Sequence, residues 1–219
     1  MLVNRYQGSI RSTLALADTL PYNADRGQTT MCALRLVLLG GFRAECDGVP
    51  VNAFDSDKAR ALLAYLAVEG HRSHRRDELI GLFWPEMPQR RALHNLSQTF
   101  YSLRSAFPRN PEGSLFEVTP QEIRIRGDAC WADSVEMVTL LQNCEAHHHD
   151  PDSLCRACRD RLEQAVALYH GDFLAGLYLK DCAGFDEWQT ARRESLKASL
   201  IRALGWLSRS LERSGTLEQ

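Results

Sequence analysis

The chain has 219 residues, of which 44% are hydrophobic and 25% charged, a balance that is ordinary for one or two globular domains. Its formal net charge of −2 excludes a polycation. No apolar run approaches the roughly 20 residues that a membrane-spanning helix needs, and the first residues do not resemble a signal peptide. The seven cysteines are an odd number, which argues against a secreted disulfide framework. We therefore expect a cytoplasmic protein with no membrane partner.

The charges are unevenly distributed along the chain. Residues 56–127 carry eleven basic and eight acidic side chains, whereas residues 128–219 carry ten basic and fifteen acidic ones. A locally basic region can bind phosphate groups even in a slightly acidic chain. An excess of three positive charges is also compatible with ordinary scatter, so charge alone does not decide the function.

The first part of the chain predicts a small antiparallel sheet. Residues 1–33 mix Gly, Ser, Thr, Asn and Pro without a period and are expected to be disordered. Strands are predicted for residues 34–39 and 42–46, where apolar and polar residues alternate or leucines cluster. A turn at Asp47–Gly48 leads into a third extended segment, residues 49–51.

Three helices and a hairpin are predicted next. The helices are expected from apolar stripes at helical spacing, at residues 56–70, 75–83 and 89–107. The hairpin is formed by residues 115–118 and 123–125. Strands, three helices and a hairpin follow one another in the order of a winged helix-turn-helix with an additional N-terminal sheet, over residues 34–127.

After Gly127 the pattern becomes helical throughout. Helices are predicted at residues 134–144, 158–169, 184–194 and 196–213. Helix pairs of this size suggest a short tetratricopeptide-like array over residues 128–219, although the repeat of about 34 residues typical of such arrays is not found. The predicted fold is thus an α+β winged helix-turn-helix followed by an all-α domain.

The third predicted helix has an outer face without acidic residues. This face carries Arg90, Arg91, His94, Asn95, Ser97, Gln98, Tyr101 and Arg104. Arginine pairs with guanine and asparagine or glutamine with adenine, and a helix fits the major groove of DNA. The alternative is a solvated polar face, but such faces usually mix both signs of charge. The residues expected nearest the base edges are Arg91, His94, Asn95 and Gln98.

Other basic side chains are expected to contact phosphates. Arg124 and Arg126 alternate with Ile123 and Ile125, so they point away from the core of the predicted hairpin. The other expected phosphate contacts are Lys58, Arg75 and Arg76. Together with the third helix, they predict binding of double-stranded DNA.

The residues of these elements resemble a known family. Residues 34–127 are similar to the OmpR/PhoB-type winged-helix domain, and more narrowly to that of the Streptomyces antibiotic regulatory proteins (SARP). The segments that carry this resemblance are Lys58-Ala-Arg-Ala-Leu-Leu63, Leu82-Phe-Trp-Pro85 and Leu103-Arg104. The second part resembles the bacterial transcriptional activation domain of those proteins, through Ala165-x-x-Leu-Tyr-x-Gly-Asp-Phe-Leu174, Gly176, Phe185-Asp-Glu-Trp188, Arg192 and Arg193.

The resemblance implies a bacterial transcriptional regulator, usually an activator that binds repeated promoter sites. In the family, the third helix reads the major groove and the wing the adjacent minor groove. The helical domain would contact RNA polymerase or mediate self-association, which implies a homodimer on DNA. The helical part is shorter here than is usual in the family. Neither a GxxxxGK[ST] motif nor a preceding receiver domain is found, so nucleotide or phosphorylation switching is not expected.

A cluster of cysteines and histidines lies between the first two predicted C-terminal helices. Its members are Cys144, His147, His148, His149, Cys155 and Cys158. Cys144, His147, Cys155 and Cys158 could hold a structural zinc ion. The alternatives are a histidine-rich loop with incidental thiols and a redox-active CxxC motif. No other cofactor is expected.

No enzymatic motif is found. GxSxG, HExxH and the Rossmann glycine pattern are all absent from the sequence. We therefore expect no enzyme. The alternative to a DNA-binding regulator is a protein-interaction module in which the helical array is the working part.

Overall fold

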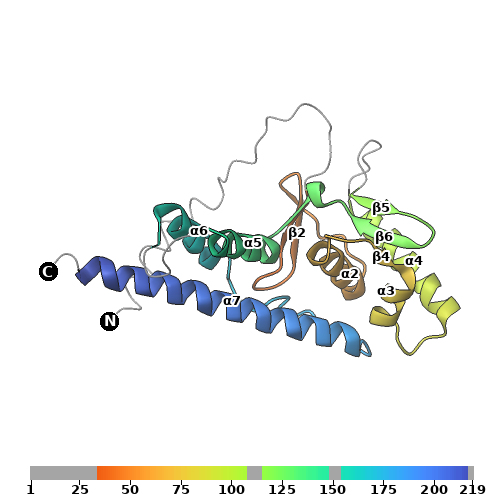
Figure 1. Cartoon of the computed structure of the whole chain (residues 1–219). Helices are drawn as coiled ribbons and strands as arrows, with labels where there is room; N and C mark the ends of the chain where they lie inside the picture. Colours follow the sequence, from red (N-terminus) through yellow and green to blue (C-terminus); the bar gives the residue numbers. More distant parts are fainter. Residues whose placement is uncertain (1–33, 108–114, 148–153, 217–219) are drawn as a thin grey trace. The chain divides into compact units, whose positions relative to one another are not determined.

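Figure 1 presents the protein as a computed structural model, which describes residues 34–107, 115–147 and 154–216. The elements belong to one unit of the chain, residues 31–219. In order they are β1 (Leu34–Val37), β2 (Arg43–Cys46), β3 (Val49–Pro50), α2 (Asp57–Val68), β4 (His74–Arg75), α3 (Arg76–Phe83), α4 (Gln89–Ser105), β5 (Phe116–Val118), β6 (Glu122–Ile125), the short 3-10 helix η2 (Gly127–Ala129), β7 (Cys130–Ala132), α5 (Asp133–Glu145), α6 (Arg156–Ala167) and α7 (Ala183–Thr216). The predicted disorder of residues 1–33 lies outside the described residues.

The N-terminal strands form a four-stranded sheet in the order β3-β2-β1-β7. Strand β1 pairs antiparallel with β2, with Leu34 opposite Cys46. On its other edge β1 pairs parallel with β7, with Leu36 opposite Ala132. The strands of the predicted antiparallel sheet are confirmed, but the prediction that only helices follow Gly127 is wrong. Three residues are too few to show strand periodicity, and β7 is extended because its backbone pairs with that of β1.

Asp133 closes the end of the buried strand β1. It is the first residue of α5 and is only 2% exposed. Its carboxylate accepts the N–H groups of Leu38 and Leu39, each at 2.9 Å, and that of Ser134 at 2.7 Å. Burial raises the pKa of this carboxyl despite the three hydrogen bonds. The side chain thus satisfies two backbone donors that have left the ladder of the sheet.

A second sheet of three strands has the order β4-β6-β5. The predicted hairpin is present as β5 and β6, with Phe116 opposite Ile125. The additional strand β4 pairs His74 with Ile123 and Arg75 with Glu122. We expected the second helix to include Arg75, but this residue is in β4 and precedes α3 as its N-cap. A two-residue strand has no sequence signature of its own.

The three helices between the sheets follow the predicted spacing. The side chain of Ser56 accepts the N–H of Ala59 at 3.3 Å and so caps α2. Helix α4 has a single apolar stripe whose buried members are Ala92, Leu96, Phe100 and Leu103. Helices α3 and α4 pack against one another, and α2 packs against α4. The remaining faces of α4 are therefore left to solvent.

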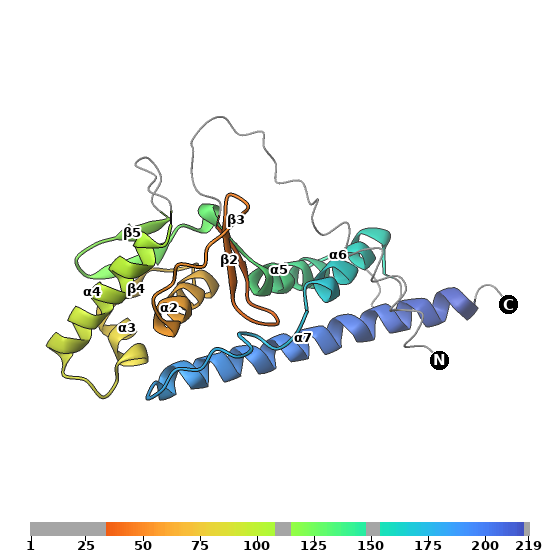
Figure 2. The same cartoon turned by 180° about the vertical axis from the view of Figure 1, so that it is seen from behind.

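Three helices, not four, follow β7 in the described part of the chain. Helices α5 and α6 match two predicted ones, but the helices predicted at 184–194 and 196–213 form the single helix α7. The intervening Arg-Glu-Ser-Leu sequence contains no proline or glycine to end a helix, so the prediction of a break was wrong. Both α5 and α6 pack along α7 (Figure 1 and Figure 2). None of the described helices combines the length and apolarity needed to cross a membrane.

Replacement of Asp133 by alanine should destabilise the fold. The change would leave the buried N–H groups of Leu38 and Leu39 without acceptors. We expect the free energy of unfolding to fall by about 2–6 kcal/mol, because each of the two unsatisfied buried donors costs about 1–3 kcal/mol. Urea denaturation would measure this, with the exposed Asp160→Ala as the matched control. Equal stability of the two variants would show that the carboxylate is not needed to close β1.

Candidate nucleic-acid interface

Helix α4 presents a polar, basic face to solvent. Most members of the predicted set are exposed: Arg90, Arg91, His94, Ser97, Gln98, Tyr101 and Arg104. Tyr101 is 70% exposed, an unusually open position for a large aromatic side chain. The helix itself contains no Asp or Glu. The face thus offers hydrogen-bond donors and positive charge over four turns.

Side chains from outside α4 contact several residues of this helix. Asn95 is half-buried, and its side-chain amide donates to the sulfur of Met87 in the preceding loop at 3.1 Å. Ser102 donates to the carboxylate of Asp55, which places one acidic group from outside the helix beside its C-terminal half. Gln89 at the start of α4 likewise donates to the carboxylate of Asp77 at 3.3 Å, so an acidic group from outside the helix lies beside each half of α4.

The structure brings α4 together with the start of α3 and with the hairpin. A hollow of about 410 Å³ is lined by Arg76, Ser97, Phe100, Tyr101, Arg104, Ser105 and Val118. Arg76 donates to the carbonyl of Thr119 at 3.5 Å, and its buried Nε has no hydrogen-bond partner among the described residues. Arg76 of α3 thus shares one concave surface with Tyr101 and Arg104 of α4.

The two hairpin arginines differ in their surroundings. Arg124 lies between the buried residues Ile123 and Ile125, as the alternation predicted, and stands opposite Glu117 on β5. Arg126 forms an ion pair with Asp128 at 3.2 Å, and hydrogen bonding to this carboxylate raises the pKa of the guanidinium. Both positive charges are therefore partly compensated by nearby carboxylates.

Lys58 does not join this surface. Its ammonium donates to the carbonyl oxygen of Phe83 at 2.7 Å and lies 4.8 Å from the centre of the Trp84 ring. The Phe83 carbonyl is at the C-terminal end of α3, where a cation is favoured by the helix dipole. Lys58 thereby joins the start of α2 to the end of α3, and its expected phosphate contact stays a prediction.

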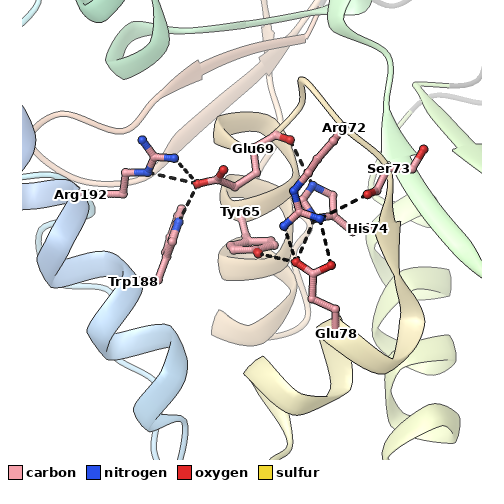
Figure 3. A network of polar contacts seen from close by, with 8 residues as sticks. All are labelled: Tyr65, Glu69, Arg72, Ser73, His74, Glu78, Trp188 and Arg192. Atoms are coloured by element: carbon pink, nitrogen blue, oxygen red, sulfur yellow. Dashed lines mark hydrogen bonds and ion pairs between the residues drawn. The ribbon is translucent and has the colours of Figure 1, made fainter.

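A polar network behind this surface was not predicted (Figure 3). His74 is fully buried, and its Nε2 donates to the carbonyl oxygen of Glu69 at 3.1 Å. Burial lowers the pKa of this imidazole. Tyr65 donates to the carboxylate of Glu78 at 3.2 Å, and burial first of all raises the pKa of the Tyr65 phenol to about 12. His74 Nδ1 also lies 3.7 Å from the Glu78 carboxylate, and only the spacing of four residues between them could have indicated this contact from the sequence.

Arg72 completes this group of side chains around Glu78. Its guanidinium forms a two-pronged contact with the Glu78 carboxylate, one arm at 2.9 Å. Hydrogen bonds from Arg72 lower the pKa of Glu78 to about 2. The network therefore holds the end of α2, strand β4 and the first turn of α3 in one arrangement.

Glu69 extends the network to α7. Its carboxylate accepts Trp188 Nε1–H at 2.8 Å and Arg192 Nε–H at 3.1 Å. Burial acts to raise the pKa of Glu69, but the hydrogen bonds from Trp188 and Arg192 outweigh it and lower the pKa. These partners lie 119 and 123 residues away in the sequence, which is why no local pattern predicted them.

The cysteine–histidine cluster is partly assembled. His147 Nδ1 lies 3.3 Å from Cys158 Sγ and 3.5 Å from Cys155 Sγ. Cys144, the fourth predicted ligand, instead donates from its thiol to the carbonyl oxygen of Cys158 at 3.6 Å. It lies outside the set of donor atoms that are all within 4.8 Å of one another. The neighbouring His148 and His149 lie outside the described residues.

Comparison with known proteins supports the fold. No protein-family model matches the sequence, and no curated protein matches it. The chain is similar to a solved structure of Mycobacterium tuberculosis EmbR in complex with a low-affinity phosphopeptide, with 23% sequence identity and a TM-score of 0.60. The similarity covers 77% of this chain and 44% of the EmbR chain, so this chain spans less than half the length of EmbR. The arrangement of an N-terminal sheet followed by helices is thus shared with EmbR.

Replacement of Glu78 by glutamine should destabilise the protein in a pH-dependent way. Because the pKa of Glu78 is about 2 in the folded state, against about 4.3 in an unfolded chain, its carboxylate stabilises the fold above about pH 5. This contribution is lost as the pH falls toward 2. We expect the wild type to be more stable than Glu78→Gln at pH 7, and the difference to shrink below about pH 5.

Urea denaturation at a series of pH values would measure this difference. Glu163→Gln, an exposed glutamate on α6, is the matched control and should show little difference at any pH. A stability difference for Glu78→Gln that stays constant down to pH 2 would contradict the expected role of the Arg72 contact.

Proposed function

We propose that this chain is a DNA-binding transcriptional regulator. The observation that carries the proposal is the exposed face of α4, which is free of acidic residues and adjoins Arg76 and the hairpin β5–β6 across one hollow. Helices α2, α3 and α4 with the hairpin then form a winged helix-turn-helix, in which α4 is the recognition helix. The helix would enter the major groove and the hairpin the adjacent minor groove.

The roles of individual side chains follow from their positions. Arg91, His94, Asn95 and Gln98 lie on the exposed side of the first half of α4 and would read base edges. Asn95 would exchange its contact with Met87 for one with a base. The side chains proposed to contact phosphates are Arg75, Arg76, Arg90, Tyr101, Arg104, Arg124 and Arg126. Lys58 is left out because it is bound to Phe83 and Trp84.

The helices α5, α6 and α7 would serve partners other than DNA. The resemblance to SARP regulators supports activation through contact with RNA polymerase and a homodimer on repeated sites. Adjacent binding on tandem sites would raise the affinity of each protomer for its own site. The similarity to EmbR supports the fold on which this proposal rests.

A protein-interaction module is the second candidate function. One observation favours it: α7 exposes three large apolar side chains, Ile201 at 69%, Leu204 at 42% and Leu211 at 46%. Their spacing places them near one face of the helix. In this alternative, α4 would bind DNA only in the non-specific range.

Selection of bound duplexes from a random pool, at near-physiological salt, would test the proposed function. We expect enrichment of a repeated motif by the wild type. Arg91→Ala and Asn95→Ala should each weaken binding to it by roughly 5- to 150-fold, which corresponds to the ~1–3 kcal/mol of a base contact. Arg104→Ala should weaken binding to all sequences alike and reduce the salt slope by about one unit.

Matched controls come from exposed residues of the C-terminal helices. Arg156→Ala on α6 removes the same charge as Arg91→Ala, and Asn143→Ala on α5 removes the same amide as Asn95→Ala. Both should retain wild-type selection. Absence of an enriched motif, or enrichment that survives Arg91→Ala and Asn95→Ala, would exclude α4 as the reading helix and favour the interaction module.

A further inference from the structure

The end of α5 and the start of α6 bring three soft donor atoms together. His147 follows directly after Ala146, the C-cap of α5. Cys155 is the N-cap of α6, and its sulfur accepts the N–H of Cys158 at 3.4 Å. The CxxC spacing at a helix start thus turns both sulfurs toward the same side, where they meet the imidazole of His147.

The distances between these donor atoms fit one tetrahedral ion. With Zn–S of about 2.3 Å and Zn–N of about 2.0 Å, tetrahedral geometry requires a sulfur–nitrogen distance of about 3.5 Å. The observed distances from His147 Nδ1 are 3.3 Å to Cys158 Sγ and 3.5 Å to Cys155 Sγ. All three donors lie within 4.8 Å of one another. No large movement would be needed to place them around one ion.

The types of donor atom in this cluster favour zinc over magnesium or calcium. Two thiolates and one imidazole are ligands that suit zinc, whereas magnesium and calcium prefer oxygen. Cys158 is buried, Cys155 is half-buried and His147 is exposed, and three protein ligands leave the fourth position of a tetrahedral ion to a water molecule. Among the residues that the structure describes, no other group of three His, Cys, Asp or Glu side chains is placed closely enough to hold an ion.

We propose that His147, Cys155 and Cys158 bind one Zn²⁺ ion that fastens the end of α5 to the start of α6. The role is structural. Helix α5 starts at Asp133, which closes β1, and α6 packs on α7. The ion would therefore connect α5, which contacts β1 through Asp133, to α6, which packs on α7. This inference does not depend on DNA binding.

The metal content of the full-length chain is the first test. We expect about one zinc ion per chain after expression with added Zn²⁺ and gel filtration, measured by mass spectrometry of the metal. Cys155→Ser and His147→Ala should lose most of the zinc. Cys130→Ser changes a half-buried thiol outside the cluster and should retain it. Replacement of zinc by Co²⁺ should produce a thiolate-to-cobalt charge-transfer band that the same two variants lack.

Thermal unfolding provides a second readout. Chelation should lower the melting temperature of the wild type to that of Cys155→Ser, and added Zn²⁺ should restore only the wild type, because an ion that binds the folded state stabilises it. Cys155 and His147 are not fully buried, so their variants should fold even where Cys158→Ser does not.

Three results would overturn the proposal. The first is a wild-type chain that holds no zinc after exposure to Zn²⁺. The second is zinc content that is unchanged in both Cys155→Ser and His147→Ala. The third is recovery of Cys155 and Cys158 as a disulfide in the freshly purified protein, which would point to the redox motif.

Discussion

The leucines of β1 and of the two positions after it, Leu34, Leu36, Leu38 and Leu39, are each at most 1% exposed, and their backbone polar groups need partners inside the protein. Strand β1 pairs on one edge with β2 and on the other with β7. Beyond the strand, the N–H groups of Leu38 and Leu39 are accepted by Asp133, and the carbonyl of Leu38 accepts the N–H of Leu174 at 2.7 Å. Gly40 then donates to the carbonyl of Asp172 at 3.1 Å. Because an unsatisfied buried group costs free energy comparable to a lost hydrogen bond, this segment requires chain from far beyond Gly127 to complete it.

This requirement explains why the C-terminal helices are packed on the N-terminal sheet. A boundary near Gly127 was expected from the change in sequence pattern, yet β7 and the Asp172–Leu174 segment both serve β1. Aromatic packing adds to these backbone bonds. Phe185 of α7 lies 5.4 Å from Phe83 of α3, and Trp188 lies 5.0 Å from Tyr65 of α2, measured between ring centres. Helices α2 and α3, which pack against α4, are therefore also in contact with α7.

Local periodicity predicted the parts of the fold that local interactions determine. The cap at Ser56, the apolar stripe of α4 and the alternation at Ile123 and Ile125 each have a short-range cause, and the predicted basic face of α4 followed from them. Strands β4 and β7 were missed because two or three residues carry no period, and their pairing partners are distant in sequence. The contacts of Lys58 could not be predicted for a related reason, since Phe83 and Trp84 belong to another helix and its end. Sequence distance, more than burial, separates what could be predicted from what could not.

The buried carboxylate of Glu69 shows how α7 is joined to the helices that support α4. A glutamate at the C-cap of α2 faces the negative end of the helix dipole, an unfavourable position unless donors compensate it. Trp188 and Arg192 of α7 provide these donors, while the backbone carbonyl of the same glutamate accepts the buried imidazole of His74 in β4. A shift of α7 away from α2 would leave a buried charge without partners, which is costly. It follows that one set of hydrogen bonds joins α7, the end of α2 and β4, and so connects the long C-terminal helix to the elements that adjoin α4.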